Sequence, residues 1–318
     1  AGRSHGPTNA FRIKPAIAGT GTSLLSTYTG SDTAYATASG TSMASPNVAG
    51  SLILLQEYYF KTTGEIPLSS TIKALVFNGA KDAGDIGPDP IFGWGFLDMK
   101  KSSQIIGENV SNKTIVESSI LNGEEIEYNL EVSEGIENIS VTICWTDPSA
   151  NSLENAEDKD ASVLVNDLDM RIVEISDGEV IHLPYTLSLE NLNINGVWAV
   201  KADNSKDNVE RIDFMATQGA VYKILINHKN SIENPTVDND ELKFQNFSIV
   251  VSEGSRINTT LSNDNVFDLN NNAFHYYANR TSLNLTNHNN YSIDKLGIYG
   301  ITGKLLYSKS NIGSINNY

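Results

Sequence analysis

Residues 40–50 read GTSMASPNVAG, and this stretch decides how the first hundred residues fold. The turn Gly40-Thr41 leads directly into a run whose apolar residues recur at helical spacing. These residues are Val48, Leu52, Leu55 and Tyr59. We expect one buried helix from about Ser42 to Lys61, with Pro46 in its first turn, where a missing N–H does no harm. Ser42 then lies at the N-terminal end of that helix.

Two further helices are expected before residue 107. The run STIKALVFN at 70–78 places apolar residues on one face behind a Ser/Thr cap, and a third helix is expected over 97–106. Between them, GPDPIFGWG at 87–95 supplies turn residues and a packed Trp94.

After Gly107 the pattern changes to short alternating runs separated by Gly, Asn, Asp and Pro. The runs are TIVESSIL, EEIEYNLEV, ISVTICW, VLVNDLDMRIVEI, ERIDFMA, VYKILINH and FSIVVS. They predict an antiparallel sandwich or jelly roll over 107–253. Residues 254–318 are rich in Asn and Ser, and KLGIYGITGKLLYSK within them predicts a hairpin around Thr302-Gly303.

Charge and composition narrow the function classes. The chain has 318 residues and a formal net charge of -16, and residues 108–160 are strongly acidic with only Lys113 and Lys159 as basic residues. This argues against a nucleic-acid partner. The acidic stretch is read as a solvated face or as a source of calcium ligands. The single cysteine, Cys144, lies in an apolar run and is expected in the core.

The ends of the sequence also carry an expectation. The chain opens with AGRSHGPTNA, without a Met or an apolar signal region, and its longest aliphatic stretch, LILL at 52–55, is too short to cross a bilayer. We therefore expect no transmembrane segment and a natural polypeptide that begins earlier than Ala1.

Ser42 has two possible roles at the start of its helix. Amides in the first turn of a helix are unpaired and partly positive, so the Ser42 amide can donate to an oxyanion that forms when its own Oγ attacks an acyl group. Gly40 and Ala44 are small enough for a substrate to approach. The other role is that of a simple N-cap. Spacing alone does not decide between them, and the stretch is not a G-x-S-x-G elbow because position 44 is Ala.

The stretch GTSMASPNVAG resembles the nucleophile signature of the subtilases, the subtilisin-like serine peptidases. Upstream, GPTNAFRIKPAIAGTGT at 6–22 is similar to the segment that precedes the serine in that family, although Ala16 stands where Asp is common and Thr20 where Pro is common. Downstream, FGWG at 92–95 is similar to the turn that closes the catalytic domain. The resemblance implies that Ser42 is the nucleophile and that Thr41 assists the oxyanion, unless the Thr41 methyl only packs.

The same resemblance implies that residues 1–106 are the C-terminal third of an α/β domain with a mostly parallel sheet. In the family, the catalytic Asp and His and the oxyanion Asn precede the serine, so all three would fall before Ala1. No histidine of this chain has the family's histidine context; they are His5, His182, His228, His275 and His288. Without a base, the Ser42 hydroxyl is a poor nucleophile. We expect residues 1–106 to be unstable alone and 107–253 to fold independently.

Three motifs in the middle of the chain resemble a jelly-roll domain that follows the catalytic domain in some bacterial subtilases. They are CWTDP at 144–148, LVNDLDM at 164–170 and DNVERI at 207–212. Their polar residues are candidate calcium ligands or simple turn residues. The candidates are Asp147, Asn166, Asp167, Asp169, Asp207, Asn208 and Glu210.

The C-terminal hairpin resembles the sorting domain of the type IX secretion route of Bacteroidota, with Tyr299 and the Gly303-Lys304 turn as markers. This resemblance implies a secreted or cell-surface protein that contacts secretion machinery through residues 254–318.

The expected function is that of a serine endopeptidase that hydrolyses protein or peptide substrates through an acyl-enzyme on Ser42. Its chemistry needs no cofactor, and calcium would be structural. One alternative is a non-catalytic surface protein with a degenerate subtilase scaffold and a peptide- or glycan-binding β domain. Another is a calcium-dependent binding module, which leaves residues 1–106 unexplained.

Overall fold

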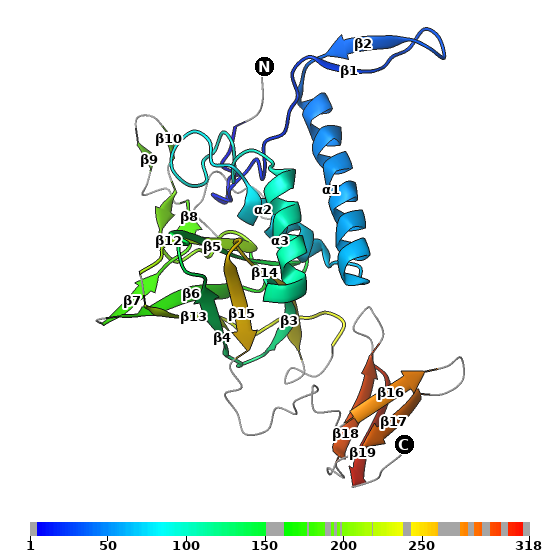
Figure 1. Cartoon of the computed structure of the whole chain (residues 1–318), viewed down its shortest axis with the longest axis vertical. Coiled ribbons are helices and arrows are strands. Elements are labelled where there is room, and N and C mark those ends of the chain that lie inside the picture. Colours follow the sequence, from blue (N-terminus) through cyan, green and yellow to red (C-terminus); the bar gives the residue numbers. More distant parts are fainter. Residues whose placement is uncertain are drawn as a thin grey trace. The chain divides into compact units, whose positions relative to one another are not determined.

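The structure, a computed structural model, describes most of the chain (Figure 1). The described residues are 5–150, 162–176, 178–187, 192–193, 196–197, 199–217, 219–237, 243–259, 274–278, 283–287, 293–299 and 305–313. Two compact units are present, residues 1–234 with 239–260 and residues 235–238 with 261–318, and each is described by itself.

The described residues form three helices near the positions that the sequence predicts, although the third runs six residues past its expected end. They are α1 (Thr41–Thr63), α2 (Ser69–Gly79) and α3 (Met99–Asn112). Helix α1 ends at Gly64, whose φ of 79° fits the left-handed C-cap and whose amide donates to the Phe60 carbonyl. Helix α3 begins at Asp98, which accepts from the Lys101 amide at 3.0 Å. Pro46 lies beyond the first turn of α1, so the Ser42 carbonyl has no N–H donor four residues later.

The expected Ser/Thr cap of α2 is wrong in detail. The N-cap is Leu68, and it makes no side-chain cap bond. Instead, the hydroxyls of Ser70 and Thr71 lie 2.7 and 2.8 Å from Ser248 Oγ on the neighbouring strand. They join the helix to a sheet and do not close its first turn.

Helix α1 is largely uncovered, although the sequence predicts a buried helix. Within its fully described length, only Leu55 and Tyr59 are buried, whereas Ile53 is 65% and Leu54 64% exposed. A helix that is apolar on all sides normally lies inside a larger protein. None of the described helices is long and apolar enough to cross a membrane.

Two antiparallel sheets form the β-rich part of the first unit, in agreement with the predicted sandwich. One has the order β12-β5-β14-β3, and the other β15-β4-β13-β6-β7. Their bounds are β3 (Ile115–Leu121), β4 (Ile126–Val132), β5 (Asn138–Trp145), β6 (Leu168–Ile175), β7 (Glu179–His182), β12 (Val209–Met215), β13 (Val221–His228), β14 (Phe244–Val251) and β15 (Ser255–Thr259). Alternate side chains of both sheets share one apolar core around Trp145, Met170 and Phe247. Strand β15, at the edge of the five-stranded sheet, lies past the expected domain boundary at residue 253.

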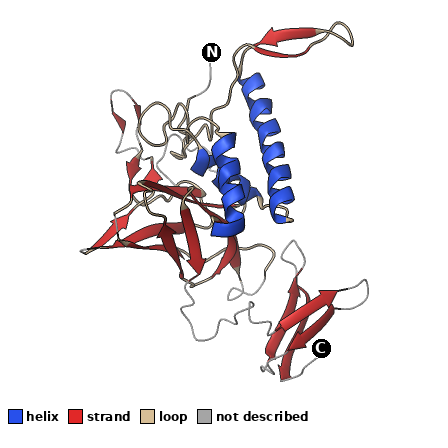
Figure 2. Cartoon of the chain, in the orientation of Figure 1, coloured by secondary structure: helices blue, strands red, loops and turns tan. Residues whose placement is uncertain are grey.

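Helix α2 covers the outer face of the four-stranded sheet, where it packs on β5 and β14. Figure 2 shows the helices of this unit gathered on one side of the strands. Because both faces of β5 are covered, every residue from Ile139 to Trp145 is buried. A second apolar cluster joins Ile13, Leu75 and Trp94 to Cys144 and Val250. The core positions predicted for Trp94 and Cys144 are confirmed.

The first hundred residues contain little sheet. A hairpin of β1 (Leu24–Thr27) and β2 (Tyr35–Ala38) precedes α1, and one isolated parallel bridge joins Ala18 to Phe96. The expected parallel sheet is not found among the described residues of this region. Between β7 and β12, the part of the chain that the structure describes contains four two-residue strands; they are β8 (Tyr185–Thr186), β9 (Leu192–Asn193), β10 (Gly196–Val197) and β11 (Val200–Lys201).

The described residues of the second unit form two antiparallel pairs. Strand β16 (Phe274–Ala278) pairs with β17 (Leu283–Asn287), and β18 (Ile293–Tyr299) with β19 (Leu305–Gly313). The pairing of Ile298 with Tyr307 confirms two antiparallel strands in the predicted hairpin. Its turn, Thr302-Gly303 with Lys304, lies outside the described residues, and its role in sorting stays a prediction.

Candidate active site

Ser42 lies in the first turn of α1, where its side chain is exposed to solvent. The first closing bonds of the helix run from the Met43 and Ala44 amides to the Gly40 carbonyl, at 3.1 and 3.2 Å. The Thr41 and Ser42 amides precede these bonds and belong to the unpaired donors of a helix start. The geometry therefore offers a hydroxyl and an amide of the same residue to one bound group.

The loop behind this turn packs very closely against it. The Gly40 amide donates to the Gly21 carbonyl at 2.8 Å. A Cβ added to Gly21 would lie 2.8 Å from the Ala44 Cβ, and one added to Gly19 would lie 2.5 Å from a Val48 methyl. A side chain at either position would force its neighbours to shift, so the two glycines let residues 19–21 pack directly against the chain on both sides of Ser42.

No proton acceptor accompanies Ser42 in the described part of the chain. Its hydroxyl makes no hydrogen bond to a described histidine or carboxylate. His182 instead bonds Glu174 at 2.8 Å, and His228 accepts from the Gly123 amide while its other nitrogen contacts the Asn230 carbonyl. Neither of these histidines contacts Ser42. Thr41 is exposed beside it, and its side chain bonds no described residue.

Residues 1–95 match the sequence model of the subtilase family. The match includes Ser42, the close-packed loop at 19–21 and the turn that holds Trp94. It supports a subtilase identity for this region and, at the level of the family, a serine-peptidase-type function.

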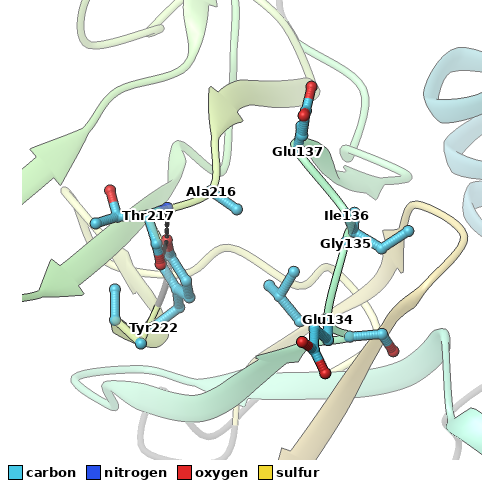
Figure 3. A pocket seen from close by; sticks show the side chains of 11 residues that line it. Glu134, Gly135, Ile136, Glu137, Ala216, Thr217 and Tyr222 are labelled. Atoms are coloured by element: carbon cyan, nitrogen blue, oxygen red, sulfur yellow. Dashed lines mark hydrogen bonds between the residues drawn. The ribbon is translucent and has the colours of Figure 1, made fainter.

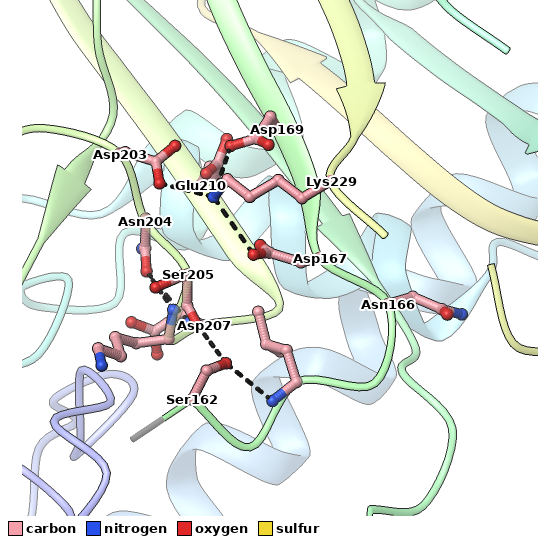
Figure 4. A network of polar contacts seen from close by, with 12 residues as sticks. Ser162, Asn166, Asp167, Asp169, Asp203, Asn204, Ser205, Asp207, Glu210 and Lys229 are labelled. Atoms are coloured by element: carbon pink, nitrogen blue, oxygen red, sulfur yellow. Dashed lines mark hydrogen bonds and ion pairs between the residues drawn. The ribbon is translucent and has the colours of Figure 1, made fainter. Parts of the chain in front are cut away.

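Two of the acidic residues expected to bind calcium, Asp167 and Asp169, lie with Asp203 around an ammonium group (Figure 4). Lys229 Nζ lies 3.2 Å from Asp167, 3.1 Å from Asp169 and 2.6 Å from Asp203. Arg171 pairs with Asp169 and Asp203 from another side. Burial alone would lower the pKa of Lys229, but these carboxylates raise it above its ordinary value.

The other expected calcium ligands point elsewhere. Asp147 accepts from the Val165 and Asn166 amides, each at 2.8 Å. Asn166 donates to the Glu233 carbonyl and to Gln245, and Asn208 donates to the Trp145 carbonyl. In the described ranges, no three acidic, histidine or cysteine side chains are arranged to hold a metal ion. The expected convergence on one cation is therefore not seen, because each side chain satisfies a backbone group or an ion pair. Calcium binding stays a prediction.

Glu210 is the most strongly perturbed acid of this region. Its side chain is fully buried, Oε2 accepts from the Met170 amide at 2.6 Å, and Oε1 has no partner within the described residues. Burial, and after it the charge of Asp169, raises the pKa of Glu210 well above its usual range. No local sequence pattern predicts that Asp169 and Glu210 lie near each other, because their strands meet only through the packing of the two sheets.

A pocket of about 650 Å³ opens at one end of the sandwich, between the loops 132–137 and 216–222 (Figure 3). The Tyr222 hydroxyl accepts from the Thr217 amide at 2.6 Å on one wall, and Glu134, Gly135 and Ile136 form the other. The described lining contains no histidine and no cysteine; its carboxylates are Glu134 and Glu137, and its hydroxyls are those of Ser133, Thr217 and Tyr222.

Proposed function

We propose that this chain is part of a subtilisin-like serine endopeptidase whose nucleophile is Ser42. The observation that carries the proposal is the exposed Ser42 at the first turn of α1, backed by the glycine loop and lying within the region that matches the subtilase family. A serine that served only as an N-cap would accept from its own helix, whereas α1 has no side-chain cap bond and its N-cap is Gly40.

The proposed reaction is hydrolysis of a peptide bond in two steps. Ser42 Oγ attacks the scissile carbonyl carbon while a base takes the hydroxyl proton, and the carbonyl oxygen becomes an oxyanion that accepts from the Ser42 amide. The C–N bond then breaks, the amine leaves with the proton, and an acyl-enzyme remains on Oγ. Water repeats the sequence, releases the acid and restores the Ser42 hydroxyl.

The base and the carboxylate that orients it are proposed to come from polypeptide outside residues 1–318. The exposed apolar side chains of α1 support this proposal. Besides Ile53 and Leu54, Phe60 is 53% and Tyr58 41% exposed. Such a surface is normally covered by protein. The polypeptide that covers α1 is the natural source of the missing groups and of a parallel sheet.

The test extends the open reading frame upstream as far as it runs and treats the product with a fluorophosphonate that labels activated serines. We expect labelling of Ser42 in the extended protein, loss of labelling in Ser42→Ala, and retention in Ser45→Ala, an exposed serine of the same helix. Residues 1–318 alone should label at the rate of an ordinary serine. The proposal fails if an extended protein that folds and contains a histidine and an aspartate leaves Ser42 unlabelled; the non-catalytic scaffold then becomes the better hypothesis.

We further propose that the protein acts outside the cell or at its surface and that residues 254–318 contact secretion machinery. The support is the β18–β19 pairing, which agrees with the hairpin on which the sorting-domain resemblance rests. Fusing residues 254–318 to a periplasmic reporter tests this proposal, since export of the fusion in a type IX-competent cell is expected and retention would contradict it.

A further inference from the structure

We propose that Asp207 of the β-sandwich is a positioning residue for Ser42, acting through residues 12–21. The catalytic meaning of this inference rests on the proposed function, but the mechanical link can be tested without any activity.

The link begins at two adjacent residues of the sandwich. Asp207 Oδ1 accepts from the Ile13 amide at 3.0 Å and lies 3.8 Å from the Arg12 guanidinium. The same guanidinium donates to Asn208 Oδ1 at 2.5 Å. Asp207 is 1% exposed and Ile13 is also 1% exposed, so these bonds are shielded from water. Residues that resemble calcium ligands in the sequence therefore hold a loop of the subtilase-like region.

Asp207 and Asn208 are themselves fixed to the sandwich core. The Asp207 amide donates to Asn204 Oδ1 at 3.1 Å. Asn208 and Trp145 exchange two bonds, from Asn208 Nδ2 to the Trp145 carbonyl at 2.8 Å and from the Trp145 amide to the Asn208 carbonyl at 3.2 Å. Because Trp145 is fully buried between the sheets, the anchor moves only if the core moves.

From Ile13 the chain runs to the nucleophile turn through a series of close contacts. The Ala16 carbonyl accepts from the Trp94 amide, and the Ala18 amide donates to the Gly95 carbonyl at 2.9 Å. The Gly21 carbonyl then accepts from Gly40, two residues before Ser42. A Cβ on Gly93 would lie 1.9 Å from the Pro15 carbonyl oxygen, so the turn at Gly93 packs directly against the backbone at Pro15, between Ile13 and the Ser42 turn.

Burial of Asp207 is costly, which favours a role beyond filling space. Desolvation, opposed by the charges of Arg12 and Lys14, raises the pKa of Asp207 to about 6, and its Oδ2 has no partner among the described residues. An apolar side chain would avoid that cost but would leave the Ile13 amide unbonded. The carboxylate is therefore one of the contacts that connect the sandwich to residues 12–21, beside the bond from Arg12 to Asn208.

The test is hydrogen exchange of the 318-residue chain, followed on peptides that cover residues 9–22 and 36–45. Asp207→Ala should speed exchange of the Ile13 amide about tenfold, as expected when a buried hydrogen bond is lost, and should also speed exchange at Gly40. Asp207→Asn keeps an acceptor oxygen and should restore both rates. Arg12→Met, which alters a part-exposed side chain, gives a second perturbation if Asp207→Ala fails to fold.

The matched control is Asp167→Ala, a buried acid of the same sandwich that pairs with Lys229 and does not contact residues 12–21. It should leave both peptides unchanged. Faster exchange at Ile13 with Gly40 unaffected in both perturbed variants would overturn the proposal, because Asp207 would then be a local anchor only. Failure of the proposed function looks different: Ser42 would stay unlabelled in the extended protein whatever the exchange rates.

Discussion

Replacing Asn78 tests whether α2 and the β-sandwich form one cooperative structure. Asn78 is fully buried, and its Nδ2 lies within hydrogen-bonding distance of the Ser140 carbonyl at 2.9 Å, Thr142 Oγ1 at 3.1 Å and the Val250 carbonyl at 3.1 Å. One side-chain amide on a helix therefore joins two adjacent strands, β5 and β14.

Asn78→Ala should lower the free energy of unfolding by about 1–3 kcal/mol. The loss comes from carbonyl oxygens left without this donor and from a small cavity, each worth about 1–3 kcal/mol at a buried site. Two features keep the total low. The Ser140 carbonyl also accepts from the Ser252 amide, and Asn78 Oδ1 has no partner in the described residues, so its removal relieves a cost. In a unit of this size, the change corresponds to a fall in Tm of roughly 3–10 °C.

The assay is calorimetric and circular-dichroism melting of the 318-residue chain, with Asn47→Ala on the exposed side of α1 as the control. The control should change stability by less than about 0.5 kcal/mol. Asn78→Ala should lower the melting temperature of the whole β-sandwich, because the contact of α2 with β5 and β14 is part of the cooperative unit. A sandwich transition that stays in place while a separate helical transition moves would refute the reasoning. It would also favour the sequence-based expectation that 107–253 folds independently of 1–106.

Three other perturbations have definite outcomes. Glu210→Gln should raise Tm at pH 7–8 and flatten the pH dependence of Tm. Because the pKa of Glu210 is raised in the folded state, that state keeps a proton that the unfolded state loses above about pH 4.5, and wild-type stability therefore falls as the pH rises above that value. A melting profile that is unchanged between pH 5 and 8 would contradict this prediction. Lys229→Met should lower the free energy of unfolding by about 1–3 kcal/mol, a figure reduced for partial exposure, because Asp167, Asp169 and Asp203 lose the ammonium group between them. Calcium should then raise the Tm of the variant and leave the Tm of the wild type unchanged. A wild-type Tm that falls with EDTA would instead favour a native calcium site. Burial raises the pKa of Cys144, so the thiol should react with a disulfide reagent only on unfolding, and rapid labelling of the native chain would show that the core is open.

The sequence predicted the elements of this fold well because their signals are local. Helical spacing located α1 to within two residues at each end, and alternation located the strands of both sheets except β7 and β15. Two of the calcium candidates and Lys229, which no motif includes, come together only when β6 and β13 pair. Alternating Asp residues place carboxylates on one side of a strand, but they carry no information about which cation lies there. The contact between Ile13 and Asp207 spans almost two hundred residues, and no local pattern encodes it.

The prediction that α1 is buried was wrong for most of the helix, and the reason bears on function. The run from Leu52 to Leu55 is apolar on all sides, which predicts burial, yet the described residues cover only one stripe of the helix. The adjacent hairpin of β1 and β2 exposes Leu25 and Tyr35, and an isolated two-stranded hairpin is marginal in water. The N-terminal end of the same helix holds Ser42, the proposed nucleophile, which bonds no base among the described residues. The uncovered apolar surface and the proposed nucleophile thus lie on one element, which is why we propose that a single layer of protein over α1 supplies both the packing and the base.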